Sequence, residues 1–161
     1  MAKTKKAARK RATNSKAAAK PRTAGKKPPK PQLVARKTKV GELKYIPWKT
    51  VELETMNPLL SRQLIVGQDI MIARVLMKKG AIVPLHSHHN EQVTYILEGA
   101  LKFWIDGKEI VVRAGEVLCI PPHMPHKAEA VEDTVDMDVF YPPRQDWLNK
   151  TDAYLRDDAK K

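Results

Sequence analysis

The sequence contains a single cysteine, Cys119, among its 161 residues. One cysteine cannot form an intramolecular disulfide, so a reduced setting is expected. Long apolar runs are missing as well: no stretch approaches the roughly 20 apolar residues that span a bilayer, and no apolar segment follows the N-terminal charges as in a secretory signal. We therefore expect a cytoplasmic protein with no membrane partner.

Acidic and aromatic residues are absent from the first part of the chain. Glu42 is the first acidic residue, and 15 of the 30 Lys and Arg residues precede it. No apolar cluster occurs there before Leu33 and Val34. Such a segment cannot bury enough apolar surface to offset the entropy lost on ordering. We predict a disordered basic tail over residues 1–39 and a single domain over residues 40–161.

The tail accounts for the positive net charge of the chain, +12, because the other 15 Lys and Arg residues face all 18 acidic ones. A basic tail of this kind can bind nucleic acid without sequence preference by neutralising phosphates. The simpler interpretation is a solubilising extension. The sequence leaves both interpretations open.

Short, regularly spaced turns divide the rest of the sequence into segments rich in Val, Ile, Leu, Phe and Tyr, a composition typical of strands. The strongest turn is Asp106-Gly107, a pair that favours a type I′ hairpin. Many short, evenly spaced strands predict an all-β sandwich, jelly roll or barrel. The predicted strands are 62–66, 70–77, 81–86, 92–97, 100–105, 109–113, 116–120 and 134–141.

Helical signals are confined to the C-terminus. Pro142 and Pro143 end the last predicted strand, and residues 146–156 are predicted to form one or two helical turns. Trp147, Leu148 and Leu155 are expected to pack against the barrel.

All five histidines lie within residues 86–126. His86 and His88 are two residues apart, so on a strand their side chains project from one face, which Gln92 shares if the strand is regular. His126 comes from a later segment. Three neutral imidazoles that converge from two strands can hold one divalent transition metal, and we expect Zn, Ni, Fe or Mn.

Two motifs over residues 80–126 resemble those of the cupins, a family of small β-barrels. The first cupin motif runs Gly-x5-His-x-His-x3–4-Glu-x6-Gly, and the second runs Gly-x5-Pro-x-Gly-x2-His. The corresponding residues here are Gly80, His86, His88, Gln92 and Gly99, followed by Gly115, Pro121, His123 and His126. The resemblance implies one RmlC-like jelly-roll barrel and a metal held by His86, His88, Gln92 and His126.

Two positions depart from these motifs, since Gln92 replaces the usual glutamate and His123 replaces a glycine. An amide oxygen is neutral, so the metal would keep more positive charge. That favours polarising a substrate oxygen over activating O₂. Glu91 is the alternative fourth ligand if the strand carries a bulge. His89 is predicted to point away from the site, whereas His123 is placed either at the barrel mouth or in a loop cap.

The segment after the second motif resembles the end of the pectin-degradation cupins of the KdgF type. Those proteins convert 4,5-unsaturated monouronates into linear ketouronates, using a metal held by histidines and a glutamine. The resemblance implies catalytic roles for Asp138, Phe140 and Arg144, which stand at the family spacing. Asp138 would move a proton, Phe140 would pack on the sugar ring, and Arg144 would bind the carboxylate. Tyr141 departs from the small residue expected there.

Strand parity independently places Asp138 and Phe140 on one face. The simpler alternative is an exposed Asp138 at a sheet edge, paired with Arg144. Two other functions also fit the motifs: a metal-dependent dioxygenase, which Gln92 disfavours, and a non-catalytic ligand-binding or sensor cupin whose tail contacts nucleic acid. The resemblance implies a metal-dependent uronate isomerase that binds a small sugar acid, and a homodimer, since cupins commonly dimerise through edge strands.

Overall fold

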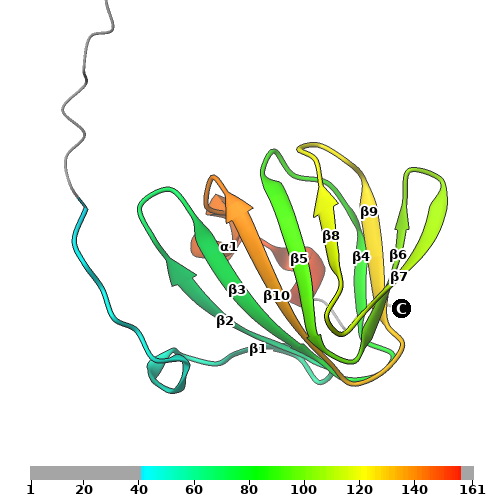
Figure 1. The fold of residues 1–161 in the computed structure, drawn as a ribbon, viewed down its shortest axis with the longest axis horizontal. Helices are drawn as coiled ribbons and strands as arrows, with labels where there is room; N and C mark the ends of the chain where they lie inside the picture. The colour runs from blue at the N-terminus through cyan, green and yellow to red at the C-terminus, as the bar shows by residue number, and fades with distance from the viewer. Residues whose placement is uncertain (1–40, 157–161) are drawn as a thin grey trace, which may run out of the picture. The chain divides into compact units, whose positions relative to one another are not determined.

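The structure is a computed structural model that describes residues 41–156 (Figure 1). The disorder predicted for residues 1–39, and the domain boundary predicted at residue 40, lie outside the described residues. Within this range no helix is both long enough and apolar enough to cross a membrane.

Two antiparallel sheets make up the described domain, and they confirm the all-β jelly-roll prediction. The six-stranded sheet has the order β1-β2-β3-β10-β5-β8, and the four-stranded sheet has the order β4-β9-β6-β7. The strands of the first sheet are β1 Glu54–Asn57, β2 Leu60–Val66, β3 Met71–Met77, β10 Thr134–Tyr141, β5 Glu91–Glu98 and β8 Val117–Ile120. Those of the second are β4 Ile82–His86, β9 His126–Ala130, β6 Ala100–Ile105 and β7 Lys108–Arg113. A short 3₁₀ turn, Trp48–Thr50, precedes them.

The turn chemistry explains several of the connections. Asp106 and Gly107 both have positive φ, 50° and 69°, as the predicted type I′ hairpin between β6 and β7 requires. Gly99 also has a positive φ, 77°, and a Cβ there would lie 2.2 Å from the carbonyl oxygen of Asp133. The last glycine of the first motif is therefore needed for a close backbone approach.

Two strands lie outside the predicted set, β1 and β9. Strand β9 consists of His-Lys-Ala-Glu-Ala, residues that favour strands weakly. Its alternation is nevertheless regular, because His126, Ala128 and Ala130 are buried while the residues between them are half-buried. Small alanines fit there because β9 lies between β4 and β6 and faces the core.

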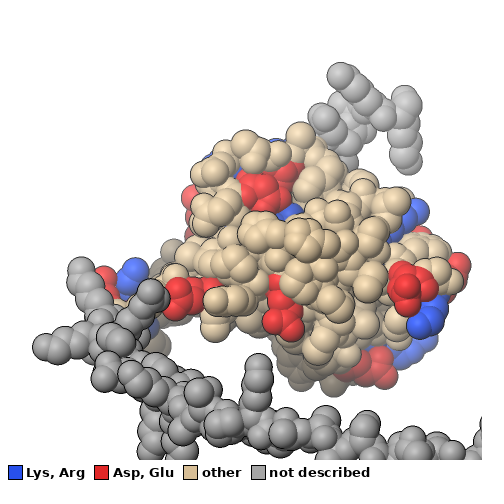
Figure 2. Space-filling view, turned by 90° about the horizontal axis from the view of Figure 1, so that it is seen from above, with Lys and Arg blue, Asp and Glu red and all other residues tan. Residues whose placement is uncertain are grey.

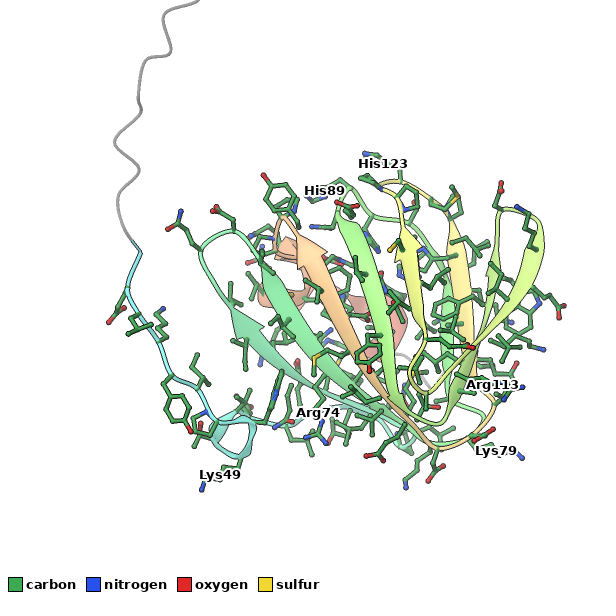
Figure 3. The ribbon with its side chains drawn as sticks, in the orientation of Figure 1. Lys49, Arg74, Lys79, His89, Arg113 and His123 are labelled. Carbon is green, nitrogen blue, oxygen red and sulfur yellow. The ribbon has the colours of Figure 1, made fainter. Side chains whose placement is uncertain are left out.

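The apolar core lies between the two sheets and includes Met71, Ile96, Leu101 and Ile120, each at most 2 % exposed. One edge of the domain carries the loops before β5 and before β9, where His89 and His123 lie (Figure 3). Seen from above in Figure 2, this side is covered largely by uncharged side chains.

The C-terminal segment forms two single helical turns, α1 Gln145–Leu148 and α2 Ala153–Arg156, as predicted. Trp147 and Leu155 are buried, but Leu148 is 40 % exposed, so the prediction that Leu148 packs on the barrel is wrong. Successive helical residues are rotated by about 100°, so burying Trp147 turns its neighbour outward. α2 contacts β1 and β4, which are edge strands of the two sheets.

Candidate metal centre

Three histidines converge inside the barrel. His86 is the last residue of β4 and pairs directly with His126, the first residue of β9. His88 follows the end of β4 in a loop, so the prediction that it shares a strand face with His86 is wrong. Its ring reaches the same place, and the ligand nitrogens of the three histidines all lie within 4.8 Å of one another. The three side chains are therefore positioned to bind one metal ion.

Backbone carbonyls fix the tautomer of each ring. The Nδ1 atoms of His86, His88 and His126 lie 2.9, 3.0 and 2.8 Å from the carbonyl oxygens of Pro84, Asn90 and Met124. A ring that donates its Nδ1 proton to a carbonyl keeps the lone pair of Nε2 free, which is the usual arrangement around a metal-binding histidine. Three such lone pairs are therefore available to one metal ion.

The three histidines also stay uncharged near neutral pH. Burial lowers the pKa of His86 to about 4, with His126 adding to the effect. Burial likewise lowers the pKa of His88 to about 4, with Arg144 as the next cause. The pKa of His126 is lowered mainly by its burial. Neutral imidazole is the form that binds metals, so the site needs no deprotonation at neutral pH.

Gln92 presents an oxygen to this cluster. Its Nε2 donates to Asp138 Oδ1 at 2.8 Å and to Thr94 Oγ1 at 2.9 Å, so its Oε1 is turned toward His88. Oε1 and His88 Nε2 are 3.1 Å apart, and with Nδ1 of His88 protonated both atoms are acceptors. Two acceptors that face each other repel, and a bound cation or a proton on His88 Nε2 relieves that repulsion. Two ligands about 2.1 Å from one ion at right angles would be about 3 Å apart, so the residues fit a divalent metal.

Glu91 does not reach the cluster. It is exposed, and the pairing of β5 with β10 is regular at this point, with Gln92 opposite Phe140 and Glu91 opposite Tyr141. The bulge that would have turned Glu91 inward is therefore absent from β5 here. His89 and His123 are exposed at the edge of the domain, apart from the three clustered histidines (Figure 3).

Asp138 lies directly behind Gln92. It is 5 % exposed on β10, between β3 and β5, which rules out the alternative of an exposed carboxylate at a sheet edge. Thr94 Oγ1 donates to Asp138 Oδ1 at 2.5 Å. Burial raises the pKa of Asp138 to about 6, against the opposing effect of the hydrogen bonds from Thr94 and Gln92. A carboxyl group with a pKa near neutrality suits proton transfer.

A second buried carboxyl, Asp136, lies two residues away on the same face of β10 and is 4 % exposed. Burial and the nearby Asp138 raise the pKa of Asp136 well above its usual value. Its Oδ1 has no hydrogen-bond partner among residues 41–156. Two buried carboxyls this close cannot both ionise easily, so Asp136 is expected to keep its proton.

Phe140 and Arg144 complete this side of the cavity. Phe140 packs edge-on against His88 and Trp147, with ring centroids 5.8 and 5.1 Å apart. Arg144 is 1 % exposed and forms a two-pronged ion pair with Asp146, through Nε at 2.9 Å and Nη2 at 2.6 Å. Its partner is therefore Asp146 rather than Asp138. Arg144 Nη1 is buried without a partner in the described part of the chain.

Most of the residues described above line one cavity of about 40 Å³, together with the aromatic rings of Trp147 and Tyr154: His86, Gln92, His126, Asp136, Asp138, Phe140 and Arg144. A water molecule needs roughly 10–15 Å³ of such space, so the cavity holds a few water-sized groups. Four residues of the site have no functional signal in the sequence. Asp136 and Tyr154 line the cavity, whereas Thr94 and Asp146 hydrogen-bond to the lining residues Asp138 and Arg144. Strand parity with Gln92 and Asp138 could have identified Thr94 and Asp136, whereas no local pattern points to Tyr154.

Comparison with known proteins agrees with this geometry. The model of the cupin domain matches residues 73–141, which contain all three clustered histidines. An uncharacterized protein of Methanocaldococcus jannaschii is 30 % identical over 96 residues, which cover 59 % of this chain and 75 % of that protein. The chain belongs to the cupin family.

Two further proteins are similar to this chain. The structure of KdgF from Halomonas sp. matches with a TM-score of 0.62 and 25 % identity, over 66 % of this chain and 99 % of KdgF. An oxalate-binding protein of Thermotoga maritima is 31 % identical over 80 residues, which cover 49 % of this cupin and 66 % of that protein. The comparisons support a metal-binding cupin of the small single-domain kind that resembles KdgF.

Proposed function

We propose that this cupin is a metal-dependent enzyme that opens 4,5-unsaturated uronates to linear ketouronates by proton transfer, without oxidation or reduction. The observation that carries the proposal is the position of Asp138. Its carboxyl group accepts a hydrogen bond from Gln92, whose side-chain oxygen faces His88. Asp138 also lines the same cavity as Arg144, whose Nη1 has no partner among residues 41–156. An acid–base group, a ligand cluster for a cation and an anion-binding group therefore share one small space.

A divalent metal held by His86, His88, Gln92 and His126 would supply Lewis-acid polarisation of a substrate oxygen. Asp138 would take the proton of the anomeric hydroxyl and return it to carbon 4 of the double bond. The ring C1–O bond breaks, carbon 1 becomes an aldehyde, and the enol oxygen on carbon 5 becomes a ketone. The product is an isomer of the substrate, so no oxidant is needed.

Arg144 and Phe140 would hold the substrate. The Nη1 atom of Arg144 is a buried donor that lacks an acceptor among the described residues, and a uronate carboxylate would satisfy it. Asp146 keeps the guanidinium oriented through its two-pronged ion pair. Phe140 would contact the sugar ring with the part of its surface that His88 and Trp147 leave open. The similarity to KdgF supports the same substrate class.

The decisive experiment follows the absorbance of the conjugated double bond in an unsaturated uronate. The full chain is loaded in turn with Ni, Zn, Mn and Fe, and the oxygen concentration is recorded at the same time. We expect the absorbance to fall with at least one metal, without oxygen uptake and with unchanged product mass. Oxygen consumption would indicate the dioxygenase alternative instead. A substrate untouched with all four metals would contradict the proposal and leave the metal centre intact.

A second candidate function is non-catalytic binding of a small acid. The volume of the cavity, about 40 Å³, favours it, and the oxalate-binding relative supports the ligand class. Calorimetric titration of the metal-loaded chain with oxalate tests this candidate. Saturable binding of oxalate, combined with no turnover of the uronate, would favour this function over the first.

Cytoplasmic location, the homodimer and a nucleic-acid contact through residues 1–39 also stay predictions. The outer face of the six-stranded sheet supports self-association, because Tyr95, Leu97 and Val117 are 40, 39 and 54 % exposed there. Sedimentation of wild type and of Val117→Asp tests the dimer, which the buried charge in the variant should dissociate.

A gel shift tests the contact with nucleic acid. The shift should be lost when residues 1–39 are deleted, and the binding should weaken as the salt concentration rises.

A further inference from the structure

The C-terminal residues 149–156, here called the gate segment, close one side of the barrel. Their helical turn α2 contacts β1 at the edge of one sheet and β4 at the edge of the other. The segment does not belong to either sheet. Its backbone receives one side-chain hydrogen bond from β1, because Asn57 Nδ2 donates to the carbonyl oxygen of Leu155 at 3.1 Å.

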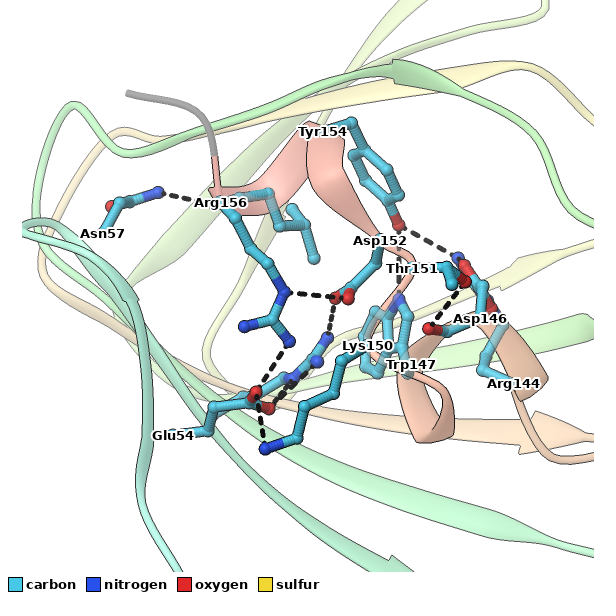
Figure 4. Close-up of polar contacts among 12 residues, drawn as sticks. Glu54, Asn57, Arg144, Asp146, Trp147, Lys150, Thr151, Asp152, Tyr154 and Arg156 are labelled. Carbon is cyan, nitrogen blue, oxygen red and sulfur yellow. Dashed lines mark hydrogen bonds and ion pairs between the residues drawn. The ribbon is translucent and has the colours of Figure 1, made fainter. Parts of the chain in front are cut away.

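Four charged side chains, here called the latch, hold the gate segment in place (Figure 4). Arg62 of β2 lies between Glu54 of β1, at 3.0 Å, and Asp152 of the gate segment, at 2.6 Å. The latter contact is an ion pair without hydrogen-bond geometry. Arg156 bonds to the same two carboxylates at 2.6 and 3.1 Å. The latch therefore consists of Glu54, Arg62, Asp152 and Arg156.

Tyr154 carries the gate segment into the metal centre. Its ring stacks on His86, with centroids 4.7 Å apart and planes at 25°. Its hydroxyl oxygen accepts hydrogen bonds from Arg144 Nη2 at 2.9 Å and from Trp147 Nε1 at 3.3 Å. Tyr154 and Leu155 both line the cavity, so the gate segment supplies part of its wall.

The cavity behind this wall is too small for a sugar acid. Small-molecule sites commonly enclose roughly 300–1,000 Å³, whereas this cavity has about 40 Å³. Separating two strands would break a ladder of backbone hydrogen bonds. Residues 149–151 are tied to α1 by three backbone hydrogen bonds, to the carbonyl oxygens of Gln145, Trp147 and Asp146, so this end is the hinge. Swinging out residues 152–156 breaks side-chain contacts and no strand ladder, so we expect the gate segment to open with less free energy than a pair of strands.

We propose that residues 149–156 are a hinged wall of the metal cavity, which the latch holds closed and which swings out to admit the ligand and then returns Tyr154 to the site. This inference rests on the proposed use of the cavity as a ligand site. Opening also withdraws the Tyr154 hydroxyl from Arg144. Nη2 is then bonded to Asp146 alone, and Nη1 still has no partner among residues 41–156. The movement that admits an acid thereby releases a donor that binds it.

Hydrogen exchange of the full chain, without metal or substrate, measures the opening directly. The amide of Leu155 donates to the carbonyl oxygen of Asp152, so it exchanges only when this turn opens. We expect it to exchange at least ~10²-fold faster than amides in the centre of β10, because local opening needs less free energy than global unfolding. Equal rates at the two places would overturn the proposal.

Two variants sharpen this measurement. Arg156→Ala removes two of the ion pairs of the latch and should speed exchange at Leu155 by about 10-fold, whereas β10 keeps its rate. Lys78→Ala is the matched control. Lys78 follows the end of β3, and the substitution removes its exposed ion pair with Asp133, which is not part of the latch. An increase in the control alone, or in neither variant, would argue against the latch.

Metal release provides an independent test. A chromophoric chelator is added to the zinc-loaded chain, and the release rate is compared between wild type and Tyr154→Ala. We expect release about 10-fold faster or more in the variant, since the ring that covers His86 is gone. Tyr95→Ala, on the outer face, should match wild type. Equal rates in Tyr154→Ala and wild type would overturn the gate. Neither readout uses a uronate, so failed turnover with normal gating contradicts only the proposed reaction.

Discussion

The barrel contains two polar clusters, the latch and the metal cluster, which differ in how their polar groups are paired. In the latch, two guanidinium groups face two carboxylates, and each charged group has an opposite charge within 3.1 Å. The metal cluster consists of His86, His88, Gln92 and His126. There, free lone pairs converge, and within residues 41–156 no cationic side chain donates a hydrogen bond to any of the four.

This difference separates a structural cluster from a functional one. A buried polar group must be neutralised or hydrogen-bonded, or it destabilises the fold. The latch meets that requirement from its own residues and needs no ligand. The metal cluster has an excess of acceptors at neutral pH, which a bound cation satisfies. Substitutions in the latch should therefore reduce stability, and substitutions in the metal cluster should reduce metal binding with little effect on folding.

The largest expected effect is the loss of metal from His88→Ala. The substitution removes one of three imidazoles and also the acceptor that faces Gln92. Elemental analysis should find stoichiometric metal in wild type and almost none in the variant. Urea unfolding of the metal-free proteins should give similar free energies, because the ring is only half-buried. Full metal retention in this variant would contradict the site.

The next effect concerns the latch. Arg62→Met removes a fully buried guanidinium and leaves Asp152, which is 1 % exposed, with Arg156 as its remaining ion-pair partner. Removing one partner of a buried ion pair typically destabilises by about 3–5 kcal/mol. Urea unfolding measures this loss, and Lys78→Ala at an exposed pair should change stability by about 1 kcal/mol or less. If Arg62→Met is as stable as wild type, the latch does not stabilise the fold, and the proposed difference between the two clusters is wrong.

Asp138→Asn tests the group that borders the metal cluster. The amide keeps the size of the side chain and removes the proton-transfer function. Turnover of an unsaturated uronate should fall by ~10²-fold or more, the usual contribution of a positioned acid–base group. Metal content should stay stoichiometric, because Asp138 accepts hydrogen bonds from Gln92 and Thr94 and forms none with the three histidines. Unchanged turnover with full metal content would remove Asp138 from the proposed reaction.

Sequence alone predicts the metal cluster better than the latch, for a physical reason. Motif spacing places His86, His88, Gln92 and His126, because local strand and turn geometry carries the information. The latch joins residues that are distant in sequence, such as Glu54 and Arg156, which are 102 residues apart. No local pattern links such charges. The contact of Tyr154 with His86 cannot be predicted from the sequence for the same reason, because tertiary packing alone determines it.

The smallest expected effect is that of His123→Gly, which asks whether a histidine beside the metal cluster belongs to it. His123 is exposed and has a φ of 64°, where the cupin motif has glycine. Its backbone N–H donates to the carbonyl oxygen of His88 at 2.6 Å, a bond that glycine keeps. Relief of the left-handed conformation should stabilise the fold by about 1 kcal/mol. The greater flexibility of glycine in the unfolded chain should offset about 0.5–1 kcal/mol of that gain. Thermal unfolding should therefore shift little, and metal content should equal that of wild type. A loss of metal comparable to that in His88→Ala would make His123 a ligand and would redefine the cluster.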